Sequence, residues 1–60
     1  MYDTSERNQA RADILIVDDE QAMRRTLSLL LEKAGHTTRS VSSTEDALRA
    51  LEERPAQLVI

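Results

Sequence analysis

Three consecutive acidic residues, Asp18, Asp19 and Glu20, are the part of this sequence best suited to chemistry. They follow the apolar run of residues 14–17 directly and precede a stretch of good helix formers. Adjacent carboxylates repel each other, so their placement side by side is unfavourable unless a cation or hydrogen-bond donors compensate. Mg²⁺ suits this position because it prefers oxygen ligands and is commonly held by one or two carboxylates plus water. The triplet is therefore a candidate Mg²⁺ site, with Asp18 and Asp19 as its ligands.

A simpler interpretation of the same residues requires no metal. Asp19 would cap the amino terminus of the helix that follows, and Glu20 would interact favourably with the positive end of the helix dipole. Acidic residues are common at helix starts, so the triplet alone does not decide between a cap and a metal site.

The elements that must position these residues can be predicted from the apolar pattern. Residues 14–17 are apolar on both faces and rich in β-branched side chains, which is typical of a central parallel strand. Residues 20–34 predict an amphipathic helix that ends at Gly35. The apolar stripe of this helix consists of Met23, Leu27, Leu30, Leu31 and Ala34.

The second half of the chain repeats the alternation of strand and helix. Residues 36–41 have the β-branched content of an exposed edge strand. Ser43, followed by Asp46, resembles a capping box and begins a helix that runs to about Glu53. Pro55 ends that helix, and residues 58–60 begin a third strand. The order predicts an α/β fold with a parallel sheet and right-handed crossovers, in which ligands collect beyond the carboxyl ends of the strands.

Composition excludes several classes of function. Sixty residues allow at most one small domain, and the net charge of -3 argues against nucleic-acid binding by this segment. No apolar run approaches the roughly 18 residues of a membrane span. Residues 1–13 lack the features of a secretory signal peptide, and we expect them to form a flexible polar leader. Together with the absence of cysteine, these features lead us to expect a cytoplasmic protein.

From residue 14 onward the sequence resembles the amino-terminal half of a bacterial response-regulator receiver domain. The segments that carry the resemblance are Ile14-Leu15-Ile16-Val17-Asp18-Asp19-Glu20, Met23-Arg24-Arg25, Leu29-Leu30-Leu31-Glu32 with Gly35-His36, Ser42-Ser43, Glu45-Asp46-Ala47-Leu48, and Pro55 before Leu58-Val59-Ile60. They fall at the family's spacing over residues 14–60, so a partial receiver domain is expected there. The resemblance implies a flavodoxin-like fold with sheet order 2-1-3 and a part in phosphorelay signalling, as a receiver of phosphoryl groups and not as an enzyme.

The same resemblance assigns roles to individual positions. Asp18 and Asp19 match the family's Mg²⁺-binding acidic pair, and Asp19 is the expected direct ligand. The family's phosphoacceptor aspartate would come immediately after Ile60, so we expect that these 60 residues by themselves are not phosphorylated at the family's site. The family's later threonine or serine and its lysine have no counterpart in residues 14–60.

Two contact surfaces are predicted. Leu29 lies off the apolar stripe of the first helix and should be partly exposed. By resemblance, that helix would dock on a sensor histidine kinase, and the predicted docking residues are Ala22, Met23, Thr26 and Leu29. A lone exposed leucine is also ordinary. The edge of the third strand, residues 58–60, would invite self-association if nothing covered it.

Two alternatives to the receiver come from other functional classes. A helix-turn-helix DNA-binding unit would need a shorter connection between the helices and the opposite sign of charge. A metal-independent protein-interaction fragment, in which Asp18 and Asp19 only cap the helix and the unit works by pairing with other chains, stays open as the alternative to the receiver. Arg24 is expected at the surface, where its four-residue spacing from Glu20 allows a weak ion pair.

Overall fold

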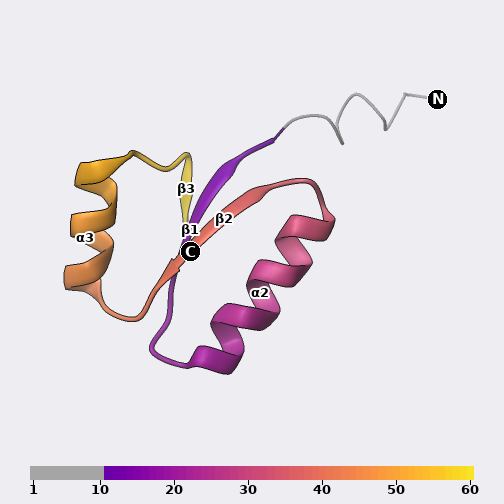
Figure 1. The fold of residues 1–60 in the computed structure, drawn as a ribbon, viewed down its shortest axis with the longest axis horizontal. Helices are drawn as coiled ribbons and strands as arrows, with labels where there is room; N and C mark the ends of the chain where they lie inside the picture. Colours follow the sequence, from indigo (N-terminus) through magenta and orange to yellow (C-terminus); the bar gives the residue numbers. More distant parts are fainter. Residues whose placement is uncertain (1–10) are drawn as a thin grey trace.

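The computed structural model describes residues 11–60, which form a three-stranded parallel sheet with one helix on each face (Figure 1). The elements in chain order are β1 (Asp13–Val17), α2 (Gln21–Lys33), β2 (Thr37–Val41), α3 (Thr44–Glu53) and β3 (Leu58–Val59). The strand order is β2-β1-β3, so the predicted α/β class, the parallel pairing and the 2-1-3 order are confirmed. β1 begins one residue earlier than predicted, and the first ten residues of the predicted leader lie outside the described residues.

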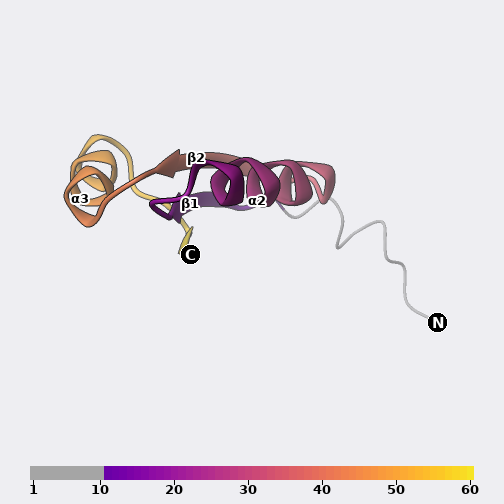
Figure 2. The ribbon, with the colours of Figure 1, turned by 90° about the horizontal axis from the view of Figure 1, so that it is seen from below.

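The side chains of β2 alternate between the two helices. Thr38 donates a hydrogen bond to Glu32 of α2, whereas the next residue, Arg39, donates to the carbonyl of Ala50 in α3. Figure 2 shows the same arrangement from below, with the sheet between α3 and α2. Because β1 is the middle strand and is covered on both faces, Ile14, Leu15 and Ile16 form the core and are at most 2% exposed. The apolar run therefore acts as the central strand that the sequence predicts.

Both helices have well-defined ends. Gly35, at φ 100°, follows the last turn of α2 in the left-handed conformation that glycine adopts without strain. The Gly35 N–H donates to the Glu32 carbonyl and the His36 N–H to the Leu31 carbonyl, which is the Schellman pattern of a helix end. Ser43 caps α3 and accepts a hydrogen bond from the Asp46 N–H at 3.1 Å, so the predicted cap is confirmed.

The predicted core-facing stripe of α2 is only partly correct. No residue of α2 is fully buried; Leu27 and Leu31 are half-buried, whereas Met23 is 43% exposed and Leu30 is 59% exposed. α2 packs most closely on the edge strand β2, and it meets the sheet through the face that carries Leu27 and Leu31. Met23 and Leu30 lie about 40° and about 60° around the helix from Leu27, on the side away from Leu31, where no described element covers them.

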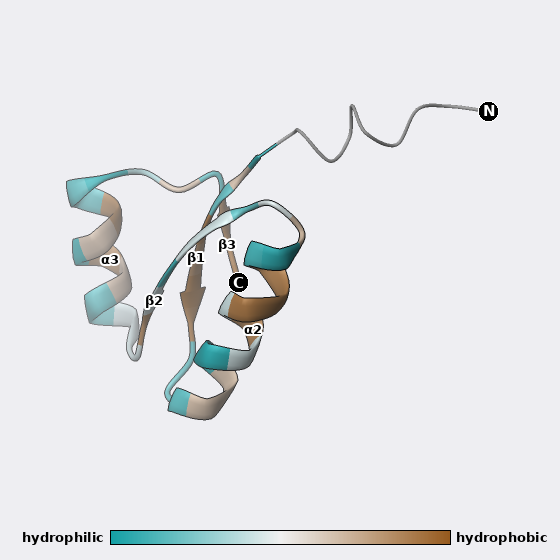
Figure 3. Ribbon diagram, turned by 45° about the vertical axis from the view of Figure 1, so that its right-hand side comes forward, coloured by the Kyte–Doolittle hydropathy of each residue, from teal (hydrophilic) through white to brown (hydrophobic). Residues whose placement is uncertain are grey.

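The third strand is also exposed. Leu58, Val59 and Ile60 are about half exposed, at 50%, 49% and 49%, because β3 pairs with β1 on one side only and no helix among residues 11–60 lies beyond it. Figure 3 shows strongly hydrophobic residues along β1 and β3 and in the second half of α2. The fold therefore leaves apolar surface uncovered on α2 and on β3.

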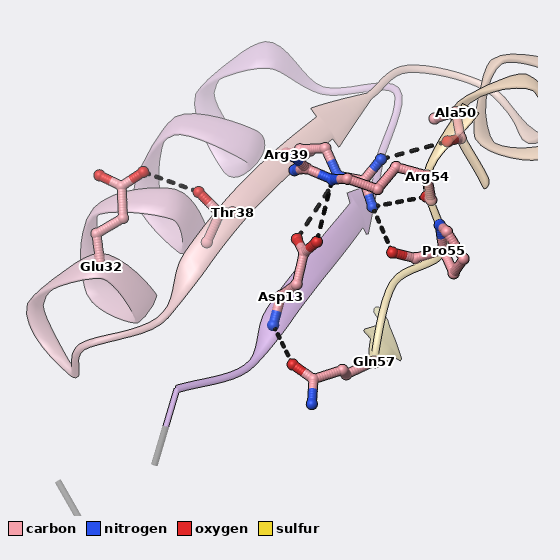
Figure 4. Close-up of polar contacts among 8 residues, drawn as sticks. All are labelled: Asp13, Glu32, Thr38, Arg39, Ala50, Arg54, Pro55 and Gln57. Atoms are coloured by element: carbon pink, nitrogen blue, oxygen red, sulfur yellow. Dashed lines mark hydrogen bonds and ion pairs between the residues drawn. The ribbon is translucent and has the colours of Figure 1, made fainter. Parts of the chain in front are cut away.

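A polar network ties α3 and β3 to the sheet at the amino-terminal end of β1 (Figure 4). The Arg39 guanidinium donates to the carbonyls of Ala50, Arg54 and Pro55 at 3.3, 3.0 and 3.2 Å. Its Nε lies 3.6 Å from Asp13 Oδ1, and neither of these two buried atoms has a hydrogen bond within residues 11–60, so their contact is ionic.

Asp13 also fixes the connection that leads into β3. Its N–H donates to Gln57 Oε1, and the Gln57 N–H donates to the Asp13 carbonyl, both at 2.8 Å. Its second carboxylate oxygen lies 3.4 Å from Arg54 Nε. Within residues 11–60, no helix has the length and apolar character needed to cross a membrane.

Candidate functional site

The ends of all three strands meet around the acidic triplet. Asp18 follows the last residue of β1, and its N–H donates to the Val41 carbonyl at the end of β2, at 3.1 Å. On the other side, the Val17 N–H donates to the Ile60 carbonyl at 2.9 Å. The acidic residues therefore lie at the carboxyl edge of the central strand, where ligands collect in open α/β sheets. The predicted strand-to-helix junction is confirmed.

Asp18 shapes the turn between β1 and α2. It is half-buried, and its Oδ1 accepts a hydrogen bond from the Glu20 N–H at 2.9 Å, which is the two-residue spacing of an Asx turn. Its backbone carbonyl accepts a hydrogen bond from Arg24 Nη1 at 2.7 Å. Asp18 thus keeps one carboxylate oxygen, Oδ2, without a hydrogen bond among the described residues.

Asp19 does not cap the helix, which corrects the metal-free interpretation of the triplet. The N-cap residue of α2 is Glu20, and no side chain makes a capping hydrogen bond there. The first helical hydrogen bond runs from the Arg24 N–H to the Glu20 carbonyl, so the helix begins one residue later than that interpretation requires. Asp19 is exposed, and its carboxylate has no hydrogen bond or ion pair with any residue from 11 to 60.

The donor atoms fit a hydrated hard cation better than a soft one. Within the described part of the chain, no group of three or more histidine, cysteine, aspartate or glutamate side chains is arranged to hold a metal ion. Two carboxylates from neighbouring residues supply oxygen ligands only, and Mg²⁺ accepts such a pair because it retains several of its waters. Zn²⁺ would require a closed set of nitrogen or sulfur ligands. Mg²⁺ binding by Asp18 and Asp19 stays a prediction.

The predicted docking residues share the solvent-exposed part of α2. Leu29 is 59% exposed, as its position off the apolar stripe predicts. The other three residues of the set, Ala22, Met23 and Thr26, are exposed as well. The surface that docking requires is therefore present, although docking itself stays a prediction.

Two residues near the sheet have contacts that the sequence did not predict. Arg24 was expected to pair with Glu20, but its guanidinium instead donates to the Asp18 carbonyl. Every residue type has a backbone carbonyl, so the sequence cannot indicate which carbonyl Arg24 will contact. The path of the turn in the structure shows that it is the carbonyl of Asp18. His36 accepts a hydrogen bond from the Ala12 N–H at 3.1 Å through Nδ1 at the start of β1, which places it at the opposite end of the sheet from Asp18.

Comparison with known proteins identifies the family. The sequence model described as the response regulator receiver domain matches residues 14–60, which is most of the chain and includes every element of the fold except the first residue of β1. Neither the curated proteins nor the solved structures that were compared with the chain gave a match. The matched range, the parallel sheet of order β2-β1-β3 and the acidic pair at its carboxyl edge agree, and the chain belongs to the response regulator receiver domain family.

Proposed function

We propose that this chain supplies the Mg²⁺-binding part of a receiver that accepts a phosphoryl group from a sensor histidine kinase. Membership of the receiver family supports phosphorelay signalling in general. The observation that carries the finer proposal is the Asp19 carboxylate, which lies at the carboxyl edge of β1 without a partner among residues 11–60. Because it is exposed, this carboxylate is available to a cation.

The chemistry of phosphoryl transfer explains why such a carboxylate pair is useful. The reaction needs a nucleophile in line with the leaving group and positive charge near the oxygens of the transferred group. A bound Mg²⁺ would supply that charge. Asp18 and Asp19 would hold the ion, and the turn at Asp18 would keep the two carboxylates at the carboxyl edge of the sheet.

The path of β3 supports a proposal for where the phosphoacceptor of the complete receiver would lie. The Ile60 N–H donates to the Leu15 carbonyl and its own carbonyl accepts the Val17 N–H, both at 2.9 Å. Ile60 therefore continues the pairing of β3 alongside β1, up to the edge that carries Asp18. In the complete receiver the acceptor carboxylate would come directly after Ile60, where it would face the acidic pair. In this proposal the domain is a phosphoacceptor rather than an enzyme, and it acts in the cytoplasm.

The exposed surface of α2 would contact the kinase. Leu29 provides an apolar centre, and Ala22 and Thr26 flank it with small side chains that would let a partner helix approach closely. Because this surface and the acidic pair are on consecutive segments, a docked kinase would lie near the phosphorylation site.

A Mg²⁺ titration of the 60-residue chain tests the metal site. Backbone amide NMR signals of residues 18–20 should shift saturably as Mg²⁺ is added. Asp19→Asn should weaken this response by about tenfold or more, because one of two charged ligands is lost. The matched control is Glu52→Gln, which removes the same charge from an exposed position on α3 and should leave Mg²⁺ binding unchanged.

The same titration separates the receiver from the alternative, a metal-independent protein-interaction fragment. The exposed apolar residues of β3 favour that alternative, because uncovered apolar surface is typical of contact sites. If the wild type, Asp19→Asn and Glu52→Gln responded to Mg²⁺ equally, the metal site would be refuted and the interaction fragment would be preferred.

A further inference from the structure

A pocket on the opposite flank of α2 from Met23 and Leu30 has no part in the site described so far. It lies where α2 runs alongside β2 (Figure 1), and its volume is about 280 Å³. This is slightly below the roughly 300 to 1,000 Å³ of pockets that hold drug-sized ligands, so it suits one small group. Its lining residues are Gln21, Arg24, Arg25, Ser28 and Ser40.

The chemical character of this lining is uniform. Every lining side chain can donate a hydrogen bond, and two of them carry a positive charge. No carboxylate lines the pocket. A site of this kind is complementary to an anion that has several acceptor oxygens, and guanidinium groups in particular match phosphate oxygens through paired N–H donors.

The two arginines differ in how firmly they are held. Arg24 is half-buried, and its Nη1 is fixed by the hydrogen bond to the Asp18 carbonyl, so its remaining N–H groups keep a defined position. Arg25 is exposed and forms no ion pair or hydrogen bond with residues 11–60. The charge of Arg25 is therefore available to a ligand, while the Arg24 guanidinium lines the pocket in a fixed position.

The edge strand contributes a further donor. Among the described strands β2 pairs with β1 alone, and the Thr37 N–H and the Val41 carbonyl bond to Ala12 and Asp18, the residues that flank β1. Because successive residues of a strand direct their backbone groups to opposite sides, the Ser40 N–H points toward the unpaired edge. Ser40 can thus offer both its hydroxyl and its amide at the rim of the pocket.

We propose that the pocket formed by Arg24, Arg25 and Ser40, together with Gln21 and Ser28, binds a phosphate group. This site goes beyond the proposed receiver function, because it uses none of the residues assigned to Mg²⁺ or to the kinase. Inorganic phosphate and a phosphate monoester share the required chemistry, and the open side of the pocket admits either.

Titrating the full chain with phosphate at constant ionic strength, in the presence of EDTA, tests this proposal. We expect saturable shifts of the amide signals of Ser28 and Ser40. Arg25→Gln should weaken binding by about tenfold, since hydrogen bonds to charged groups are among the stronger ones. Arg49→Gln is the control: Arg49 is an exposed arginine on α3, its side chain is 71% accessible, and its replacement should leave phosphate binding unchanged.

The arms of the experiment separate the remaining possibilities. Tighter binding of phosphoserine than of inorganic phosphate would assign the site to a phosphate carried by another molecule, and the reverse order would assign it to the free ion. Equal shifts with acetate or chloride, or equal weakening by Arg25→Gln and Arg49→Gln, would overturn the proposal. Asp19→Asn should not weaken phosphate binding, so failure of the Mg²⁺ site would leave this result intact.

Discussion

At the scale of single residues, Arg39 joins the sheet to the segment that leads from α3 into β3. Its guanidinium satisfies the carbonyls of Ala50 and Arg54 at the end of the helix and that of Pro55 in the connection. The same group lies against the Asp13 carboxylate in a half-buried setting, where its side chain is 23% accessible. The Arg39 side chain thus compensates the partial negative charge at the carboxyl end of α3 and the charge of the Asp13 carboxylate. It also donates to a carbonyl in the turn that follows the helix.

Replacing this side chain should destabilise the fold measurably. Arg39→Met retains most of the aliphatic stem but leaves the carbonyls and the Asp13 carboxylate without their donor. We expect the free energy of unfolding to fall by about 2 kcal/mol, as measured by urea denaturation. Arg39→Lys should fall between the wild type and Arg39→Met, because an ammonium group cannot serve several carbonyls in the same fork.

The exposed Arg49 provides the control for this change. Arg49→Met removes the same charge and the same donors from α3, where the side chain is 71% accessible and its ion pair with Asp46 spans 4.0 Å. Surface pairs of this kind contribute little to stability. Similar losses for Arg39→Met and Arg49→Met would show that net charge, not the network, is responsible.

At the scale of elements, the two helices begin in different ways. α3 begins with the Ser43 side chain bonded to the Asp46 N–H and with acidic residues in its first turn, whereas α2 has neither a side-chain cap nor acidic residues in its first turn. The start of α2 is determined by the Asp18 turn instead. α3 is therefore the better-capped helix. Before α2, next to the candidate site, the Asp19 carboxylate has no partner among residues 11–60.

The cap of α3 can be tested with neighbouring serines. Ser43→Ala should lower the free energy of unfolding by about 1 kcal/mol, because the Asp46 N–H loses its acceptor. Ser42→Ala, at the exposed position just before the cap, should change it much less. Thermal unfolding followed by circular dichroism would compare the two variants, and equal destabilisation would argue against the capping hydrogen bond.

At the scale of the whole molecule, the exposed apolar surface determines how the chain should behave in solution. The core is small and is centred on the middle strand, while the residues of β3 remain about half exposed. An unpaired strand edge with apolar side chains is a template for pairing with another strand. The predicted self-association through β3 therefore has a structural basis.

Analytical ultracentrifugation would measure this self-association. The average mass of the 60-residue chain should rise above that of the monomer as its concentration increases. Val59→Lys should shift the equilibrium toward the monomer, because a lysine on an edge strand opposes edge-to-edge pairing. Leu29→Lys, at an exposed apolar position on α2, should leave it unchanged. A wild-type monomer at every concentration would contradict the prediction.

The pattern of neighbouring residues was sufficient to predict the elements and the family. The doubly apolar run of residues 14–17 identified the middle strand, Gly35 and Ser43 marked helix ends, and Asp18 and Asp19 were placed correctly at the strand-to-helix junction. These features depend on backbone preference and on local spacing, which are properties of short segments.

Only the tertiary structure decided which side chains are covered and which polar groups meet. Met23 and Leu30 belong to an apolar stripe in the sequence, yet they are exposed because α2 lies over β2. The Arg39 guanidinium donates to backbone carbonyls at least eleven residues away in the sequence. At the start of α2, Asp18 rather than Asp19 accepts a hydrogen bond from a backbone N–H, that of Glu20. Burial and hydrogen bonding depend on where distant segments lie in space, and one-dimensional spacing does not carry that information.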